Sequence, residues 1–177
     1  MSIASLAGTV VILALSTFIV KLASKIGKKE LSMIGCFISA ASFILLFIIH
    51  THNVLVWVGL IIVATIGTSM FNMVIWAMIT DVIDESEVQT GVRQDGTIYS
   101  VYSFARKLGQ ACSSGLSGVL LSIIGYTSVT AFDPKVVDGI YNITCLVPAG
   151  GMILLLLALW FLYPLNKKRV EENAEKL

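Results

Sequence analysis

The sequence predicts an all-α membrane protein, a polytopic bundle of five transmembrane helices. Two observations lead to this prediction: the composition and the presence of five long apolar runs. Hydrophobic residues fill 56% of the 177 positions and charged residues 13%, with a mean hydropathy of +0.90. A soluble globular domain carries about 25% charged residues. With a net charge of +1, the composition excludes a disordered chain, a nucleic-acid-binding protein and an ordinary soluble enzyme domain.

Each of the five apolar runs is long enough to cross the hydrocarbon core of a bilayer, which takes about 20 residues. The runs cover residues 3–20, 31–49, 54–79, 98–125 and 140–163. Hydrocarbon offers backbone groups no hydrogen-bond partner, so each run is expected to be a helix. We therefore expect one transmembrane domain over residues 1–165 and a polar cytoplasmic tail over 166–177.

The first run is expected to stay in the membrane, because no basic segment precedes it as in a cleavable signal peptide. Nine basic residues fall on one predicted side: Lys21, Lys25, Lys28, Lys29, Arg93, Lys167, Lys168, Arg169 and Lys176. Only Lys135 falls on the other side, while Arg106 and Lys107 lie inside the fourth run. The excess of basic residues in cytoplasmic loops predicts an outside N-terminus and a cytoplasmic C-terminus, in a plasma or inner membrane.

The third run carries one polar helix face, formed by Thr65, Thr68, Asn72 and Trp76 at spacings of three and four residues. Two interpretations remain open. The face provides hydrogen bonds between packed helices, or it forms one wall of an aqueous cavity. The indole of Trp76 suits either the stacking of a sugar ring or a position near the membrane interface.

The fourth run carries a longer polar stripe, formed by Ser100, Ser103, Lys107, Gln110, Ser114 and Ser117, beside a second stripe of Tyr99, Tyr102 and Arg106. An ionisable group at membrane depth costs about 2.5 kcal/mol or more, so it indicates a functional site. If the helix enters the membrane near Ile98, Lys107 lies about 14 Å deep. If it enters at Leu108, both basic residues extend to the inner surface. The continuing stripe favours the buried position. Small residues on this run predict close packing by neighbouring helices: Gly109, Ser113, Gly115 and Gly118.

An acidic segment follows the third run and is expected to be a cytoplasmic loop. Asp81 and Asp84 lie where the carboxyl end of a helix disfavours negative charge, and Arg93 is the nearest base. The segment is either a solvated acidic loop or a salt-bridge cluster that opens and closes. The sequence carries no metal-binding or nucleotide-binding motif, so neither a metal nor an organic cofactor is expected.

These segments together resemble the glycoside–pentoside–hexuronide:cation symporter family of the major facilitator superfamily. The resemblance rests on Asp81-Val-Ile-Asp84, on Thr90-Gly91-Val-Arg93-Gln-Asp95-Gly96, and on Tyr99-Ser followed by Ser103-Phe-Ala-Arg-Lys107-Leu-Gly109-Gln-Ala. It extends over essentially the whole chain. The first run resembles the eighth helix of the family and the fifth run the twelfth.

The resemblance implies symport of a sugar or glycoside with Na⁺ or H⁺. It implies that Lys107 pairs with acidic residues of the cation site. It implies that Tyr102 and Ser103 face the sugar. Asn72 stands where a member of the family has a sugar-facing aromatic residue, and it completes the expected substrate-facing set with Trp76 and Gln110. The expected cytoplasmic gating loop contains Asp81, Asp84, Arg93 and Arg106.

Members of the family have about 12 helices in two halves, and transport by alternating access needs both halves. We therefore expect this chain to be a C-terminal fragment that does not transport alone, with the bilayer and the missing N-terminal half as its partners. Two alternatives are a non-transporting membrane protein that packs with a partner subunit and, least favoured, an intramembrane enzyme.

Overall fold

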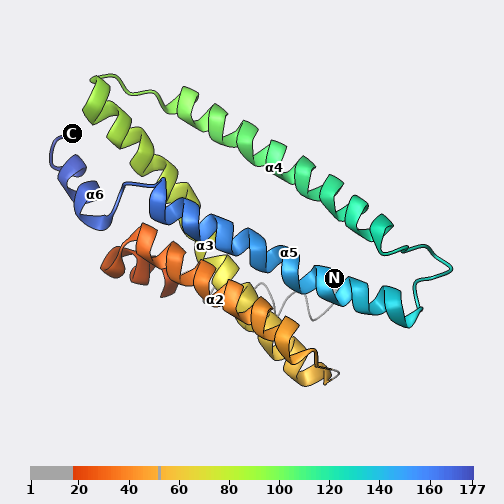
Figure 1. Ribbon diagram of the computed structural model, residues 1–177. Helices are drawn as coiled ribbons and strands as arrows, with labels where there is room; N and C mark the ends of the chain where they lie inside the picture. Colours follow the sequence, from red (N-terminus) through yellow and green to blue (C-terminus); the bar gives the residue numbers. More distant parts are fainter. Residues whose placement is uncertain (1–17, 52) are drawn as a thin grey trace, which may run out of the picture.

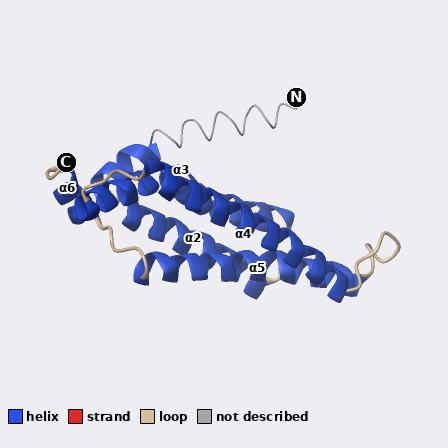
Figure 2. Cartoon of the chain, turned by 90° about the horizontal axis from the view of Figure 1, so that it is seen from above, coloured by secondary structure: helices blue, strands red, loops and turns tan. Residues whose placement is uncertain are grey.

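The computed structural model describes residues 18–51 and 53–177, and in that part of the chain every regular element is a helix. Residues 18–26 are helical and lead into α2 (Lys28–Ile49), α3 (Val54–Thr90), α4 (Asp95–Ile123), α5 (Pro134–Phe161) and α6 (Lys167–Ala174). The long helices run alongside one another, and the connections lie at their two ends (Figures 1 and 2). The all-α prediction is confirmed. The predicted span 3–20 lies outside the described residues, apart from its last three positions.

Among the described helices, α2, α3 and α5 are long and apolar enough to cross a membrane. They contain the predicted spans 31–49 and 54–79 and most of 140–163. The 29-residue α4 covers most of the predicted span 98–125 and is about 43 Å long, enough to cross a bilayer. Its serines and two basic residues make it more polar than the other three. The count of five spans therefore stays a prediction.

The closest helix contact lies between α2 and α3, where two glycines face each other. A Cβ added to Gly35 would lie 2.5 Å from the backbone oxygen of Gly67, and the reverse distance is also 2.5 Å. One turn away, the hydroxyls of Ser39 and Thr68 are 3.0 Å apart. Backbones approach this closely in membranes where no side chain separates them.

No comparable contact forms on α4 within the described part of the chain. No atom lies within 4 Å of the Cβ position at Gly109, Gly115 or Gly118. None of the α4 residues is buried. The close packing predicted for the small residues of α4 is thus absent within the described residues. Close glycine packing is found instead between α2 and α3.

A hydrophobic core joins α2, α3 and α5 at the end where α6 lies. Its buried members include Leu31, Cys36, Val74, Met78 and Leu159. At the opposite end, His50 Nε2 and Asp138 Oδ1 are 2.7 Å apart, and the Tyr141 hydroxyl donates to the Leu46 carbonyl at 2.9 Å. The core therefore joins α2, α3 and α5 at one end, and the contacts of His50 and Tyr141 join α2 and α5 at the other. α4 lies beside α3, and Ile124 at its carboxyl end lies close to Gly139 of α5.

The segment expected to be an acidic loop is helical, which corrects the sequence-based boundary. α3 has 37 residues and a length of about 55 Å, so it extends well beyond a hydrocarbon core of about 30 Å. It ends only at Gly91, whose positive φ of 71° suits glycine. Asp81 and Asp84 therefore lie on the last turns of a helix. Residues 80–90 follow the apolar stretch 54–79 and lie outside the predicted span.

The polar tail forms a helix that folds back onto the protein. Asn166 caps α6 by accepting a hydrogen bond from the Arg169 backbone N–H at 3.0 Å. The side chains of Arg169 and Asn173 bond to Glu85 of α3. A tail of this composition would be expected to extend into solvent, but these contacts hold it against α3.

Candidate functional site

A cleft between α3 and α4 gathers most of the predicted substrate-facing residues. One cavity of about 330 Å³ is lined by Asn72, Trp76, Tyr102 and Arg106, together with apolar neighbours. A second, of about 680 Å³, is lined by Asn72, Arg106 and Gln110 with small residues of α4. Because the cavities share two residues, we treat them as one site, the α3–α4 cleft. Their volumes fall in the range of small-molecule sites, about 300–1,000 Å³.

One wall of the α3–α4 cleft is aromatic. The rings of Trp76 and Tyr99 stack with centroids 5.8 Å apart and an interplanar angle of 27°. Tyr102 meets the Trp76 ring edge-on at 5.5 Å. The Arg106 guanidinium carbon lies 5.6 Å from the Trp76 ring centroid, within cation–π distance. The cleft thus offers a flat apolar surface beside a fixed positive charge.

The lining of the cleft also has free hydrogen-bonding capacity. Among the described residues, the side-chain amides of Asn72 and Gln110 have no hydrogen-bond partner. The Ser114 hydroxyl donates to the backbone oxygen of Gln110 at 3.0 Å, so its donor is already used. Free amides beside an aromatic surface suit a ligand with several hydroxyls and an apolar ring face.

The polar face predicted on the third run divides between two roles. Thr68 is half-buried and contacts Ser39 of α2, which is the helix-packing role. Asn72 and Trp76 are exposed and line the cleft, as a cavity wall would. Thr65 is exposed and donates to the Ile61 carbonyl of its own helix at 2.8 Å. Thr68 therefore fits the helix-packing interpretation, and Asn72 and Trp76 fit the cavity-wall interpretation.

Two of the predicted site residues lie outside the two cavities. Ser103 is half-buried on α4, and Lys107 is exposed. Neither lines the cleft. Within residues 18–51 and 53–177, Lys107 has no ion pair with a carboxylate. The role of Lys107 in a cation site stays a prediction.

The grouping of Arg106 with the charged loop is wrong. Arg106 lies eleven residues into α4, about 16 Å along the helix axis from Asp95. It lies over Trp76 and lines both cavities of the cleft. The helical spacing of the sequence already placed Arg106 on one stripe with Tyr102. This spacing indicated the position of Arg106 better than its charge did.

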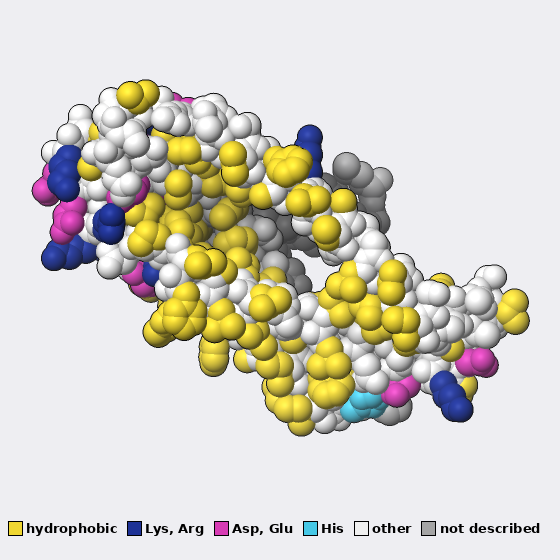
Figure 3. All heavy atoms as spheres, turned by 45° about the horizontal axis from the view of Figure 1, so that its top comes forward, with side chains coloured by type: hydrophobic (Ala, Val, Ile, Leu, Met, Phe, Trp, Pro, Cys, Tyr) yellow, Lys and Arg dark blue, Asp and Glu magenta, His cyan; other side chains and the backbone are white. Residues whose placement is uncertain are grey.

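The other three residues of the expected gating loop, Asp81, Asp84 and Arg93, lie where the carboxyl end of α3 is near α2, α4 and α6. We call this region the charged end. Lys28 pairs with Asp81 at 2.5 Å. The Arg93 guanidinium bonds Asp84 at 3.0 Å and Glu87 at 2.7 Å. Figure 3 shows basic and acidic side chains gathered on this part of the surface. The salt-bridge cluster is confirmed as a set of contacts, whereas its opening and closing stay a prediction.

Several partners at the charged end were not anticipated from the sequence. Arg93 also bonds Asp95 at the start of α4, at 3.0 Å. Glu85 is bonded by Arg169 and Asn173 of α6. The basic segment around Lys28 could have suggested the pair with Asp81, since a base in one connection can meet an acid in another connection on the same side of the membrane. Nothing in the local sequence links Glu85 to the tail, 84 residues away.

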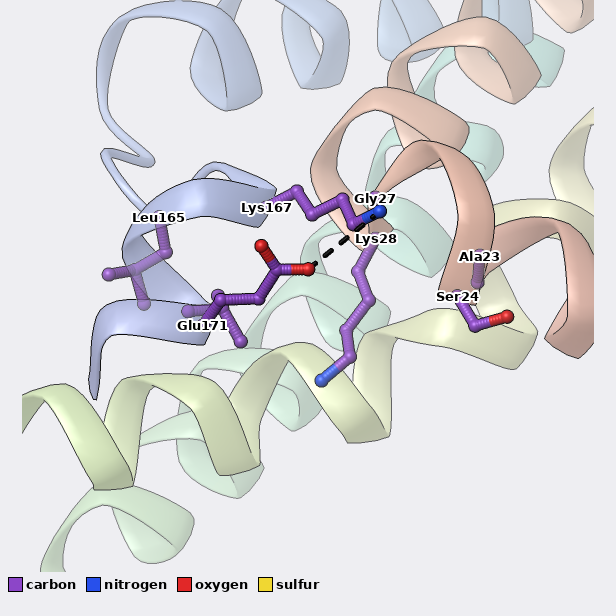
Figure 4. A pocket seen from close by; sticks show the side chains of 8 residues that line it. Ala23, Ser24, Gly27, Lys28, Leu165, Lys167 and Glu171 are labelled. Carbon is purple, nitrogen blue, oxygen red and sulfur yellow. Dashed lines mark ion pairs between the residues drawn. The ribbon is translucent and has the colours of Figure 1, made fainter. Parts of the chain in front are cut away.

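A small pocket of about 140 Å³ at the charged end does not form a second site. It lies between residues 18–26, the start of α2 and α6. Lys167 pairs with Glu171 at 3.7 Å and donates to the Lys25 carbonyl at 3.0 Å. Figure 4 shows Lys28 extending away from the Lys167–Glu171 pair. Because its cations are already paired, the pocket is a packing seam between α6 and the bundle.

Comparisons with known proteins agree with this arrangement. Residues 1–167 match a family described as "MFS/sugar transport protein". A glucuronide carrier protein homolog of Escherichia coli is 33% identical over 95% of this chain and 36% of its own length. The uncharacterized symporter YjmB of Bacillus subtilis is 38% identical over 90% of this chain and 35% of its own.

A putative sulfoquinovose importer of Salmonella typhimurium is 33% identical over 86% of this chain and 33% of its own length. The chain thus spans about a third of the length of these curated relatives. Both the family and the relatives are membrane transporters, which excludes the intramembrane enzyme. These matches show that the chain belongs to the MFS sugar transport protein family, among the glycoside–pentoside–hexuronide:cation symporters.

Proposed function

We propose that this chain is the C-terminal part of a secondary carrier that moves a sugar or glycoside together with Na⁺ or H⁺. The observation that carries the proposal is the α3–α4 cleft, which brings the aromatic ring of Trp76 and the free amides of Asn72 and Gln110 together in one lining. A pyranose presents the complementary pattern of an apolar ring face and peripheral hydroxyls. Relatives named as a glucuronide carrier and a sulfoquinovose importer support a sugar substrate.

In this proposal Lys107 serves coupling rather than sugar binding. It follows Arg106 on α4, so the two side chains leave the helix about 100° apart, and only Arg106 lines the cleft. An exposed ammonium at membrane depth needs a counter-charge. Carboxylates from a further part of the carrier would supply it. Lys107→Ala in the complete carrier should therefore abolish cation-driven accumulation, and full accumulation in that variant would refute the coupling role.

We propose that the charged end faces the cytoplasm. Of the twelve basic residues, nine lie on this predicted side, and the segment with only Lys135 lies on the other. The C-terminus would then be cytoplasmic and residue 1 extracellular. In intact cells, a membrane-impermeant thiol reagent should label the variant Ser128→Cys. It should not label Glu175→Cys. The opposite labelling pattern would reverse the orientation.

The size of the native polypeptide tests the proposed fragment directly. The 168 residues matched in the glucuronide carrier homolog are 36% of it, which implies a complete carrier of about 50 kDa. An antibody against residues 166–177 should detect a band of that size in membranes of the source cell. A band at 19.1 kDa alone would show that the fragment is made as such. It would favour the non-transporting alternative unless a second chain supplied the other half.

Sugar uptake by the complete carrier in vesicles tests the cleft. Trp76→Ala should reduce uptake because it removes the stacking surface. Trp160→Ala is the matched control, since Trp160 is exposed on α5 and lines neither cavity of the cleft. Equal uptake by both variants would remove the cleft from the substrate path.

A further inference from the structure

Arg106 differs from the other two arginines of the chain in what its guanidinium meets. Arg93 bonds three carboxylates at the charged end, and Arg169 bonds Glu85. Within residues 18–51 and 53–177, Arg106 has no carboxylate partner, and its guanidinium lies over the ring of Trp76. A guanidinium stays protonated in proteins. The α3–α4 cleft therefore contains a permanent positive charge.

The lining of the cleft provides nothing that neutralises this charge. Neither cavity is lined by an aspartate or a glutamate. Asn72 lines both cavities with Arg106, and Gln110 lies one helical turn further along α4. The cation–π contact holds the guanidinium against Trp76 without using its N–H donors. Five N–H groups in a planar fork thus remain available to a ligand.

We propose that Arg106 binds an anionic group of the transported sugar, a carboxylate or a sulfonate, and thereby selects acidic sugars over neutral ones. This proposal rests on the proposed sugar transport. The planar fork of arginine matches both groups with two parallel hydrogen bonds. The ring face of the sugar stacks on the aromatic wall, the amides of Asn72 and Gln110 bond its hydroxyls, and Arg106 holds the acidic substituent.

The proposal separates two neighbouring cations by function. Arg106 lines the cleft and would determine which substrate binds. Lys107 lies outside both cavities and would determine coupling. A variant of Arg106 should therefore change the ratio of affinities for acidic and neutral sugars, whereas a variant of Lys107 should leave that ratio unchanged.

The test uses the complete carrier in proteoliposomes and a matched pair of ligands, p-nitrophenyl β-glucuronide and p-nitrophenyl β-glucoside. A sulfonated glucose is the third ligand and distinguishes the two acidic groups. Equilibrium binding and uptake are both measured. The wild type should bind at least one acidic ligand about 30-fold or more tightly than the neutral one.

Arg106→Gln should abolish this preference and leave binding of the neutral glucoside intact. Arg106→Lys should retain part of it, because the charge remains but the bidentate fork is lost. Lys107→Ala should lose accumulation and keep the preference. Thermal unfolding in detergent verifies that each variant is folded.

Three results would overturn the proposal while the transport function stands. These are a wild type without acidic preference, an Arg106→Gln variant with an unchanged preference, and a folded Arg106→Gln variant that loses both ligands equally. The last result would mean that Arg106 pairs with a carboxylate from elsewhere in the carrier. A wild type that binds and transports no sugar would instead refute the proposed function itself.

Discussion

Lys28 at the start of α2 and Asp81 near the end of α3 form an ion pair, with Nζ and Oδ1 2.5 Å apart. The Asp81 side chain is 5% exposed, whereas Lys28 is 33% exposed. The second oxygen of Asp81 is buried without a hydrogen-bond partner in the described structure. This pair connects two helices through a nearly buried carboxylate, so the Lys28 ammonium is the main group that stabilises its charge.

Asp81→Ala should destabilise the protein, because it leaves the Lys28 ammonium without its counter-charge. Loss of one partner of a fully buried pair costs about 3–5 kcal/mol, and the partial exposure of Lys28 lowers the expected cost to about 2–3 kcal/mol. Thermal unfolding of the purified complete protein in detergent measures the effect.

Two further variants make this experiment specific. Asp84→Ala should have a much smaller effect, because Arg93 keeps its bonds to Glu87 and Asp95. The double variant Lys28→Met, Asp81→Leu should recover stability relative to Asp81→Ala, since no unpaired charge remains. Equal unfolding temperatures for Asp81→Ala and Asp84→Ala would contradict the importance of the buried pair.

Substitution of Gly67 should weaken the contact between α2 and α3. A Cβ at this position would lie 2.5 Å from the Gly35 oxygen and 2.9 Å from the Ser39 nitrogen, both backbone atoms that cannot rotate away. Gly67→Ala is expected to cost about 1–3 kcal/mol, the usual penalty for overpacking. Unfolding in detergent measures the loss.

Gly59→Ala is the matched control for that substitution. Gly59 lies on the same helix, and no atom lies within 4 Å of its Cβ position. Alanine there should be neutral or stabilise the helix by up to about 1 kcal/mol. If Gly59→Ala and Gly67→Ala destabilise the protein equally, the close contact of Gly67 with Gly35 does not account for the loss of stability.

Most of the architecture followed from local sequence, because apolar length alone determines which segments can cross a bilayer. The spans over α2, α3 and α5 were predicted in this way, and so was the shared face of Asn72 and Trp76. The prediction was wrong where distant partners decide the structure. The acidic segment that begins at Asp81 was expected to be a loop, but α3 continues through it to Thr90. Arg93 was anticipated as the base that compensates the two aspartates, whereas the pairing of Asp81 with Lys28 of α2 was not.

The site was predicted where periodicity was informative and missed where charge was taken as the signal. The helical spacing of Tyr102 and Gln110 grouped residues that line the cleft, while their contact with a substrate stays a prediction. Arg106 was grouped with the charged segment because it is basic, although its spacing put it beside Tyr102. The pairing of Glu85 with α6 depends on how the chain returns after α5, which no local pattern encodes.

Docking of α6 should persist to low pH, because hydrogen bonds from Arg169 and then Asn173 lower the pKa of Glu85 from 4.5 to about 2. A carboxylate with a lowered pKa stabilises the folded state fully above its ordinary pKa and loses this contribution as the pH falls towards its folded pKa. We therefore expect α6 to stay bound to α3 at pH 5 and above and to detach as the pH falls from about 4.5 towards 2. Glu85→Gln should detach it at neutral pH. Glu172→Gln, which removes an exposed pair with Lys168 and leaves both bonds to Glu85 in place, should not. Hydrogen exchange of the α6 amides measures detachment, and unchanged protection in Glu85→Gln at pH 7 would show that other contacts hold this helix.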